Sequence, residues 1–232
     1  MATPQLLRGA TDYENPRIRQ RYIAFEGIDG SGKSTQLDLL RGYLRRRFYT
    51  AIGLEEPTYG RWGREIRKHI ETGRPLSVER QQRMFTLDRR QHVKEKLRPL
   101  LRLVRESPTF LILQDRTYLS AAAYQATGFS REELRTLIAA QTEFAPEPDI
   151  FILLDLSVDV AMGRLHCLKV STSQFERKDI LEAAKRRYRI LADMVPRKIR
   201  IINANGTPQQ VHTRILRMLG LPSASRERGI AK

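Results

Sequence analysis

The feature that most constrains the fold is the pattern Gly-x-x-x-x-Gly-Lys-Ser at residues 27–34, a glycine-rich loop that directly follows the apolar run 22–25. Behind it, Leu37, Leu40 and Leu44 recur at the spacing of one helix face. A strand, a glycine-rich loop and a helix in this order predict a phosphate-binding loop, in which backbone N–H groups surround a nucleotide phosphate. The lysine then contacts the terminal phosphates, and the serine hydroxyl holds Mg²⁺.

A glycine-rich turn with an incidental lysine is the alternative interpretation, and the flanking strand and helix argue against it. Glycines suit such a loop because the backbone must approach the anion closely and adopt positive φ. The predicted nucleotide-binding residues are Gly27, Ile28, Asp29, Gly30, Ser31, Gly32, Lys33, Ser34 and Thr35.

The length and composition fit one α/β domain with at most a small appended lid. At 232 residues, of which 41% are hydrophobic, the chain can bury a single well-formed core. No run approaches the ~18 apolar residues of a membrane span, and residues 1–20 lack the apolar stretch of a signal peptide. A cytoplasmic protein is therefore expected. The single cysteine, Cys167, has no partner for an internal disulfide or a metal site.

The net charge of +16 raises the question of a nucleic-acid partner. The basic residues are scattered, and the densest clusters, at 45–47 and 185–187, lie in helix-like segments without interleaved aromatic residues. Solvated helix faces explain such clusters better, so nucleic acid is not the expected partner. A general preference for small anionic ligands remains compatible with this charge.

Five β-rich apolar runs alternate with segments of helix length, which predicts a five-stranded parallel sheet with helices on both faces. The runs are 22–25, 50–54, 110–113, 150–156 and 199–202. Residues 77–105 predict one long helix with Ser77 as its N-cap. Residues 1–20 and 221–232 are polar and aperiodic, so flexible ends are expected around a folded domain of residues 21–220.

Three further motifs bear on the function. Residues 55–60, Glu-Glu-Pro-Thr-Tyr-Gly, follow the second strand and therefore lie at the carboxyl edge of the sheet. The long helix carries Phe85 and, one turn later, Arg89. The third strand ends in Asp115-Arg116, the place for a second acid that organises Mg²⁺.

Together these motifs resemble the thymidylate kinase family in order and spacing, from about residue 21 to residue 219. The resemblance rests on residues 25–36, Glu56-Pro57-Thr58, Phe85 with Arg89, Asp115-Arg116 with Ser120 and Tyr124-Gln125, and Pro148-Asp149 before residues 153–156. It implies a P-loop nucleoside monophosphate kinase fold, with ATP as co-substrate and Mg²⁺ as cofactor. The implied reaction is transfer of a phosphoryl group to the 5′-phosphate of dTMP, and the implied assembly is a homodimer packed through the long helices.

The resemblance also implies roles for residues around the nucleoside. Phe85 would stack on the thymine, and Arg89 would bond to its edge; a core aromatic residue and a surface arginine are the plainer interpretations. Tyr124 would pack under the sugar and disfavour a ribose hydroxyl. Ser120 would face the base, although it could equally cap the following helix. Glu56 and Pro57 would shape the pocket.

Around the phosphates, Arg116 would bind the acceptor phosphate, where its guanidinium fork matches phosphate oxygens. Arg67 matches a second phosphate-binding arginine less securely. Asp29 would lie between the acceptor sugar and Mg²⁺, and Asp115 would support the ion, with capping of a loop or strand end as the alternative for each acid. The implied metal ligands are Ser34, Asp29 and Asp115.

In this family a catalytic arginine comes from the phosphate loop or from a lid after the fourth strand. Gly30 and Ser31 exclude the first source, so the chain resembles the lid-type bacterial enzymes, with a lid at about 164–177. Ser173-Gln174 stands where the family usually has Asp-Arg. Arg164 is the first candidate for the arginine, followed by Lys169 and Arg177, and solvated helix charges are the alternative.

Two further segments bear on the bases. Ala121 and Ala122 stand where the family often has a polar side chain for the thymine, while residues 203–207 resemble the loop beside the adenine. Kinases for another deoxynucleotide or a nucleoside are the alternative enzymes, although Arg116 and Arg67 favour a phosphorylated acceptor. A nucleotide-binding regulatory or nucleic-acid-associated protein with weak turnover is the alternative from another class.

Overall fold

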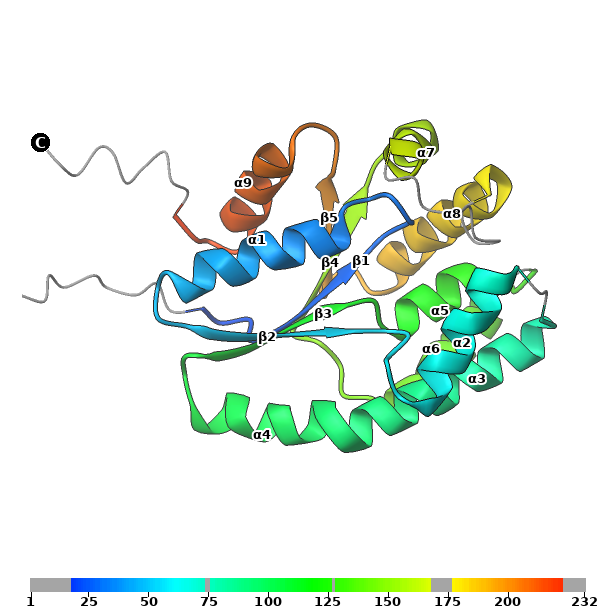
Figure 1. The fold of residues 1–232 in the computed structure, drawn as a ribbon, viewed down its shortest axis with the longest axis horizontal. Coiled ribbons are helices and arrows are strands. Elements are labelled where there is room, and N and C mark those ends of the chain that lie inside the picture. Colours follow the sequence, from blue (N-terminus) through cyan, green and yellow to red (C-terminus); the bar gives the residue numbers. More distant parts are fainter. Residues whose placement is uncertain (1–17, 74–75, 127, 168–176, 223–232) are drawn as a thin grey trace, which may run out of the picture.

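The computed structural model describes residues 18–73, 76–126, 128–167 and 177–222. Within these ranges, five parallel strands form one sheet in the order β2-β3-β1-β4-β5 (Figure 1). The strands are β1 (Tyr22–Glu26), β2 (Thr50–Glu55), β3 (Phe110–Asp115), β4 (Ile150–Asp155) and β5 (Ile199–Asn203). The predicted five-stranded parallel sheet is therefore confirmed. Each strand starts at the first residue of its predicted apolar run. Strands β1, β2, β3 and β5 continue past the last residue of the run, and β4 ends one residue before it.

Helices connect the strands and cover both faces, with α1 and α9 on one face and α3 and α4 on the other (Figure 1). They are α1 (Lys33–Arg45), α2 (Arg61–Thr72), α3 (Val78–His92), the π-helical turn η1 (Val93–Leu97), α4 (Arg98–Glu106), α5 (Tyr118–Gln125), α6 (Arg131–Thr142), α7 (Val158–Cys167), α8 (Lys178–Met194) and α9 (Pro208–Met218). No helix of the described ranges has the length and apolarity needed to cross a membrane.

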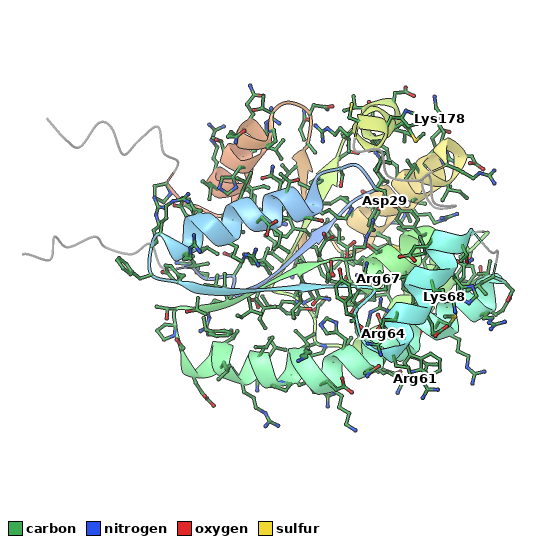
Figure 2. The ribbon with its side chains drawn as sticks, in the orientation of Figure 1. Asp29, Arg61, Arg64, Arg67, Lys68 and Lys178 are labelled. Carbon is green, nitrogen blue, oxygen red and sulfur yellow. The ribbon has the colours of Figure 1, made fainter. Side chains whose placement is uncertain are left out.

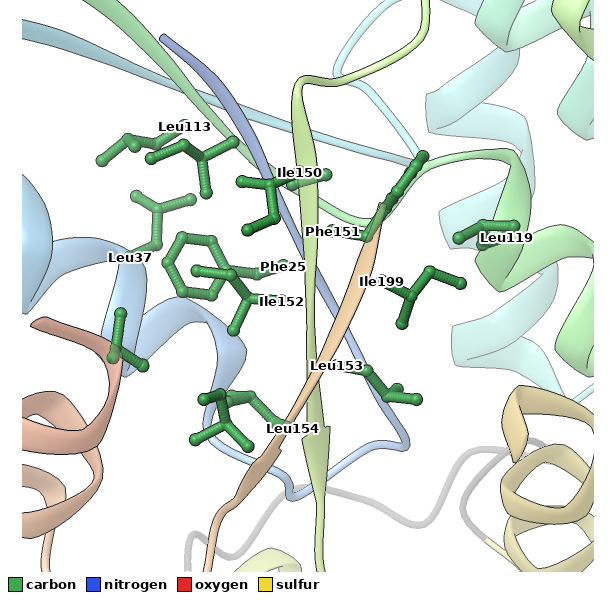
Figure 3. Close-up of a cluster of buried hydrophobic side chains, with 14 of the residues drawn as sticks. Phe25, Leu37, Leu113, Leu119, Ile150, Phe151, Ile152, Leu153, Leu154 and Ile199 are labelled. Atoms are coloured by element: carbon green, nitrogen blue, oxygen red, sulfur yellow. The ribbon is translucent and has the colours of Figure 1, made fainter. Parts of the chain in front are cut away.

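The core forms around the central strands β1, β3 and β4, which are buried on both faces. Phe25, Leu113 and Ile152, one from each strand, are at most 1% exposed and pack together (Figure 3). Continuous apolar runs in these strands follow from double coverage by helices, since neither face of the sheet meets water. The leucines at 37, 40 and 44 are buried too, so the amphipathic face predicted for α1 is confirmed.

The predicted helix at 77–105 is continuous but not regular. Ser77 is its N-cap, because its side chain accepts a hydrogen bond from the Arg80 N–H. The π-helical turn η1 separates α3 from α4 and places both Val93 and Leu97 in the core. Such a turn closes i→i+5 hydrogen bonds and so holds about one residue more than an α-helical turn, which a periodicity argument over 3.6 residues does not detect.

The packed domain extends slightly beyond the predicted boundaries of 21 and 220. Ile18 is 9% exposed and Leu221 is 6% exposed, and both belong to the core. The Tyr43 hydroxyl also donates to the Pro222 carbonyl at 2.8 Å. The rest of the predicted flexible ends lies outside the described residues.

Candidate active site

The glycine-rich loop leaves the carboxyl end of β1, the central strand, whose neighbours are β3 on one side and β4 on the other. This is the edge at which doubly wound folds bind ligands. Gly30 has φ +76°, and a Cβ there would lie 2.4 Å from the Ala161 carbonyl of α7. The loop therefore has no room for an arginine at this position, which supports the sequence argument that a catalytic arginine must come from elsewhere.

Lys33 begins helix α1 and is 6% exposed. Its ammonium donates to the Ile28 carbonyl, inside the same loop, at 3.1 Å. Burial lowers the pKa of Lys33, and Arg116 adds to this lowering, while nearby carboxylates oppose it. A cation held in a buried loop of backbone N–H groups is the arrangement that binds the phosphates of a nucleotide.

Ser34 and Asp115 meet beside this loop. The Ser34 hydroxyl donates to Asp115 Oδ2 at 2.6 Å. Asp115 is 8% exposed, and its other oxygen, Oδ1, is a buried acceptor without a hydrogen-bond partner among the described residues. A hydroxyl and a carboxylate with an unused oxygen are suitable ligands for Mg²⁺, which typically takes one or two protein carboxylates and completes its shell with water and phosphate oxygens.

The described residues contain no group of three or more histidine, cysteine, aspartate or glutamate side chains that could hold a metal ion.

Asp29 connects the phosphate loop with the tip of β3. Its Oδ1 forms an ion pair with Nη2 of Arg116. The Tyr124 hydroxyl accepts from the Asp29 N–H at 2.9 Å and donates to Asp29 Oδ2 at 3.0 Å. Burial alone would raise the pKa of Asp29, but Arg116 and Lys33 outweigh it and hold this pKa below its usual value. The carboxylate is therefore charged at neutral pH.

Two cavities open on this junction. The smaller, of about 250 Å³, is the acceptor cavity, and it reaches from Asp29 and Arg116 to Phe85 of α3. The larger, of about 900 Å³, is the loop cavity, which follows the phosphate loop to α7 and α9. The residues that line both cavities are Asp29, Glu56, Pro57, Arg67 and Arg116.

The lining of the acceptor cavity brings the predicted acceptor residues together from four separate parts of the chain. They are Asp29, Glu56, Pro57, Arg67, Phe85, Arg89, Arg116, Ser120 and Tyr124, joined by Ala121 and Gln125. The predicted loop residues Asp29 to Thr35 line the loop cavity, together with Asp115 and Arg164. These residues are far apart in the sequence, and the fold brings them together around two connected cavities.

The comparisons with known proteins give the family. The family model described as thymidylate kinase matches residues 25–215, which is most of the chain. The chain belongs to the thymidylate kinase family. The resemblance predicted from the motifs is confirmed, and with it the nucleoside monophosphate kinase fold and the phosphotransferase class.

Curated relatives from bacteria and archaea carry the same description. The chain is 47% identical to a thymidylate kinase of Akkermansia muciniphila, over 62% of this chain and 66% of that protein. It is 37% identical to a thymidylate kinase of Desulfotalea psychrophila, over 70% and 77%. It is 33% identical to a probable thymidylate kinase of Thermococcus kodakarensis, over 85% and 96%.

Within this thymidylate kinase fold, Arg89 is a buried residue and not a surface cation. It is 2% exposed. Its Nε donates to Glu56 Oε2 at 2.8 Å and its Nη1 to Gln141 Oε1 at 2.7 Å. Nδ1 of His92 lies 3.0 Å from Glu56 Oε1. Since these contacts fix the guanidinium, its remaining N–H groups have a defined direction at the cavity wall.

The buried Glu56 predicts a loss of stability in acid. Burial alone would raise its pKa, but Arg89 and His92 outweigh burial and lower it. The stabilisation that ionised Glu56 gives the folded protein is therefore complete above its unfolded pKa of about 4.3, and it is lost as the pH falls through the lower pKa of the folded state.

We expect the melting temperature to fall less steeply with acidification in Glu56→Gln than in the wild type. Thermal unfolding from neutral to acidic pH measures this, with the exposed Glu132→Gln as control. Equal slopes for wild type and Glu56→Gln would contradict the assignment.

The lid predicted at about 164–177 lies largely outside the described residues. Residues 168–176, with Lys169 and Ser173-Gln174, lie outside the described residues, and Arg177 is an exposed residue paired with Asp179. Arg164 donates from Nη2 to the carbonyls of Ala204 at 3.0 Å and Gly206 at 3.3 Å, and its Nη1 lies 3.5 Å from the Gly30 carbonyl. It therefore joins the phosphate loop to the loop predicted to lie beside the adenine.

Arg67 lies on α2, together with Arg61, Arg64 and Lys68 (Figure 2). Its guanidinium donates to the Pro57 carbonyl and to Glu55 Oε1, and it stacks 4.3 Å from the centre of the Tyr59 ring. Of these four cations, Arg67 is the one that lines both cavities. Arg67, which matches a phosphate-binding arginine of the family less securely, thus lies at the junction of the two cavities.

Ser120 does not cap the helix that contains it. Thr117 is the N-cap of α5, since its side chain accepts from the Leu119 N–H. The Ser120 hydroxyl instead donates to Glu26 and accepts from Arg116. Glu26 is a charged residue at the end of an apolar strand, and this contrast is the signal by which the sequence could have singled it out.

Two other polar residues of the site, Asp88 and Gln125, were given no role of their own by the sequence argument. Asp88, 1% exposed, accepts from the Thr58 N–H at 2.8 Å and so fixes the turn after Glu56-Pro57. Gln125 lines the acceptor cavity, and its buried Oε1 has no hydrogen-bond partner in the described part of the chain. Their spacing in the sequence gives no sign of these roles, because their partners are remote.

Proposed function

We propose that this protein transfers the γ-phosphoryl group of ATP to the 5′-phosphate of dTMP, giving dTDP and ADP. The observation that carries the proposal is the pair of connected cavities that share Asp29 and Arg116, in a chain of the thymidylate kinase family. One cavity follows the phosphate loop and suits ATP. The other has an arginine at the junction and an aromatic residue at its far side, and it suits a nucleoside monophosphate.

In the acceptor cavity, the thymine stacks on Phe85, a type of contact worth ~1–3 kcal/mol. Arg89, fixed by Glu56 and Gln141, bonds to the base edge. The unused amide oxygen of Gln125 adds a polar group to a wall that otherwise has Ala121. Tyr124 lies under the sugar, and Arg116 and Arg67 bind the phosphate.

The reaction needs no strong general base, because the acceptor phosphate oxygen is already anionic. Catalysis then consists of positioning and charge neutralisation. Lys33 draws charge from the donor phosphates, and Arg116 orients the acceptor phosphate. Asp29 holds Arg116 in place and remains ionised because its pKa is lowered. Burial of these groups strengthens each electrostatic contact.

The residues present fit Mg²⁺, the cofactor that accompanies ATP in such enzymes. Ser34 would hold the ion directly, and Asp115 and Asp29 would support it, with Asp115 offering its unpartnered Oδ1. When bound, the ion neutralises charge on the phosphate oxygens.

Arg164, the lid-side candidate, acts on the ATP side in this proposal. Its contacts with the carbonyls of Gly30, Ala204 and Gly206 place its charge along the loop cavity. We expect Arg164→Ala to lower kcat/KM for ATP about tenfold or more, as for the loss of charge-assisted hydrogen bonds, while KM for dTMP changes little. Steady-state kinetics with each substrate varied in turn measures this. An unchanged value for ATP would remove Arg164 from the machinery.

A coupled ADP-release assay across the nucleoside monophosphates tests the reaction itself. The expected result is ADP formation that depends on both dTMP and Mg²⁺. A preference for another deoxynucleotide would replace dTMP by that acceptor, and turnover of a nucleoside would argue against the phosphate roles of Arg116 and Arg67. Absence of turnover together with salt-sensitive DNA binding would favour the regulatory alternative.

The proposal includes a homodimer packed through the long helices and a cytoplasmic location. The large exposed side chains Tyr59, 67% exposed, and Leu103, 43% exposed, lie near α2 and on α4 and are compatible with a packed surface. Light scattering of the purified protein tests the assembly.

A further inference from the structure

Glu26 is a buried carboxylate that the phosphoryl transfer described above does not use. It ends β1, is 1% exposed, and lines neither cavity. Its Oε1 accepts from the N–H of Thr117 at 2.8 Å and from the Thr117 hydroxyl at 2.7 Å. Its Oε2 accepts from the hydroxyls of Ser120 at 2.6 Å and of Tyr188 at 2.9 Å. All four donors are neutral groups.

A carboxylate in this position is costly for the fold. Removing it from water disfavours the charged form, and burial accordingly raises the pKa of Glu26. The four hydrogen bonds satisfy its oxygens, as a buried polar network requires. An apolar residue would complete the strand at a lower cost in free energy, so we look for the groups that the carboxylate holds in place.

The first group that it holds is the turn at Arg116. This residue has φ +68°, a left-handed conformation that costs a side chain with a Cβ free energy and persists only where neighbours fix it. Phe25 accepts from the Arg116 N–H at 3.0 Å, and Glu26 accepts from the next N–H, that of Thr117. Two consecutive residues of β1 therefore bind two consecutive amides of the turn.

The second group is the Arg116 side chain itself. Its Nη1 donates to the Ser120 hydroxyl oxygen at 3.1 Å, and that hydroxyl is oriented by its bond to Glu26. Tyr188 completes the arrangement from α8, with its hydroxyl 2.8 Å from the Ser120 oxygen. Helix α8 follows residues 168–176, so the arrangement connects the far side of the predicted lid with the acceptor arginine.

We propose that Glu26 and Tyr188 form a positioning pair, which fixes the left-handed turn and the guanidinium of Arg116 toward the phosphate of the acceptor nucleotide. The inference rests on the proposed function, because it needs an acceptor phosphate at Arg116. Neither residue touches the substrate. The end of β1 thus sets the relative positions of the donor loop, which follows it, and of the acceptor arginine, which hydrogen-bonds to it.

Calorimetric titration with dTMP, and separately with a non-hydrolysable ATP analogue and Mg²⁺, tests the pair without turnover. We expect Tyr188→Phe to weaken dTMP binding about tenfold, the lower end of the range for a hydrogen bond to a charged group, and to leave affinity for the ATP analogue within about twofold. Tyr43→Phe is the matched control, because it also removes a buried tyrosine hydroxyl, one bonded to Pro222. It should leave both affinities unchanged.

Glu26→Gln supplies a second and stronger variant. The glutamine keeps the size, but its NH₂ group faces either the two Thr117 donors or those of Ser120 and Tyr188. We expect dTMP binding to weaken roughly a hundredfold. In Glu26→Gln/Tyr188→Phe the two losses of dTMP affinity should be less than additive, because both residues act on Arg116 through the same hydrogen-bond network. Two independent structural defects would add.

Melting temperatures of all variants complete the test. Equal weakening of both ligands in Tyr188→Phe, or unchanged dTMP affinity in a folded Tyr188→Phe, would overturn the inference. Fully additive losses of dTMP affinity in the double variant would overturn it as well. A wild-type protein that binds no dTMP would overturn the proposed function and this inference together, whereas wild-type binding with unaltered variants overturns the inference alone.

Discussion

Lys33→Ala is expected to lower kcat by about 10³-fold, the upper range for losing one preorganised group that stabilises charge in the transition state. Lys33 is 6% exposed and its ammonium donates to the Ile28 carbonyl within the phosphate loop, so its charge acts where water screens it little. Because burial lowers the pKa of Lys33, the folded protein disfavours this charge when no phosphate is bound. Phosphates supply the missing counter-charge, and the loss should therefore appear in turnover.

The measurement is kcat from ADP release at saturating dTMP and ATP, with the melting temperature as a check on folding. Lys178→Ala is the control, since Lys178 is 59% exposed and paired with Asp159 on the surface. Its activity should remain within about twofold of the wild type, as for surface substitutions in general. A Lys33→Ala protein that kept more than about a tenth of wild-type turnover would contradict the proposed transfer from ATP.

Arg116→Ala is expected to weaken dTMP binding about a hundredfold, as for truncating one partner of a hydrogen-bonded charge pair that is largely shielded from water. In the proposed function, the substitution removes the cation that binds the acceptor phosphate, and it also leaves Asp29 without its ion pair. KM for dTMP should rise far more than KM for ATP, because the proposal assigns Arg116 to the acceptor phosphate. The measurement is steady-state kinetics with each substrate varied, accompanied by titration with dTMP.

Two further substitutions at this position separate the causes. Arg116→Lys keeps the charge and loses the fork, so it should fall between wild type and alanine. Arg116→Gly relieves the strain of φ +68° and also lacks the side chain, so it should match alanine in dTMP binding. Arg135→Ala, at an exposed pair with Glu132, is the control. Wild-type affinity for dTMP in Arg116→Ala would exclude this residue from the acceptor site.

The parts of the site that follow local chemistry could be predicted. The loop at 27–34 combines a strand, three glycines at positive φ and a helix start, and each of these is specified by residues within a few positions of one another. The five strands followed from apolar runs, and Ser77 was recognisable as an N-cap from its own segment. The positions of Asp115 and Arg116 at the end of β3 followed from topology, whereas the place of Phe85 in the site followed from the family resemblance.

The parts that depend on remote partners could not be predicted. The burial of Arg89 depends on Glu56 and Gln141, which lie on other elements. The contacts of Arg164 with Ala204 and Gly206 depend on how α7 approaches the loop after β5. The π-helical turn within the long helix depends on packing of that helix against the sheet, and helical periodicity does not reveal it.

The sequence by itself determined the phosphate loop, the order of the strands along the chain and the family, because these depend on residue types at short, fixed spacings. Only the tertiary structure decided how Arg116 is held. Tyr188 and Glu26 are 162 residues apart, and Thr117 and Glu26 are 91 apart. A hydrogen bond over such a separation depends on where the fold brings two elements together, and nothing in the spacing of either residue specifies that position.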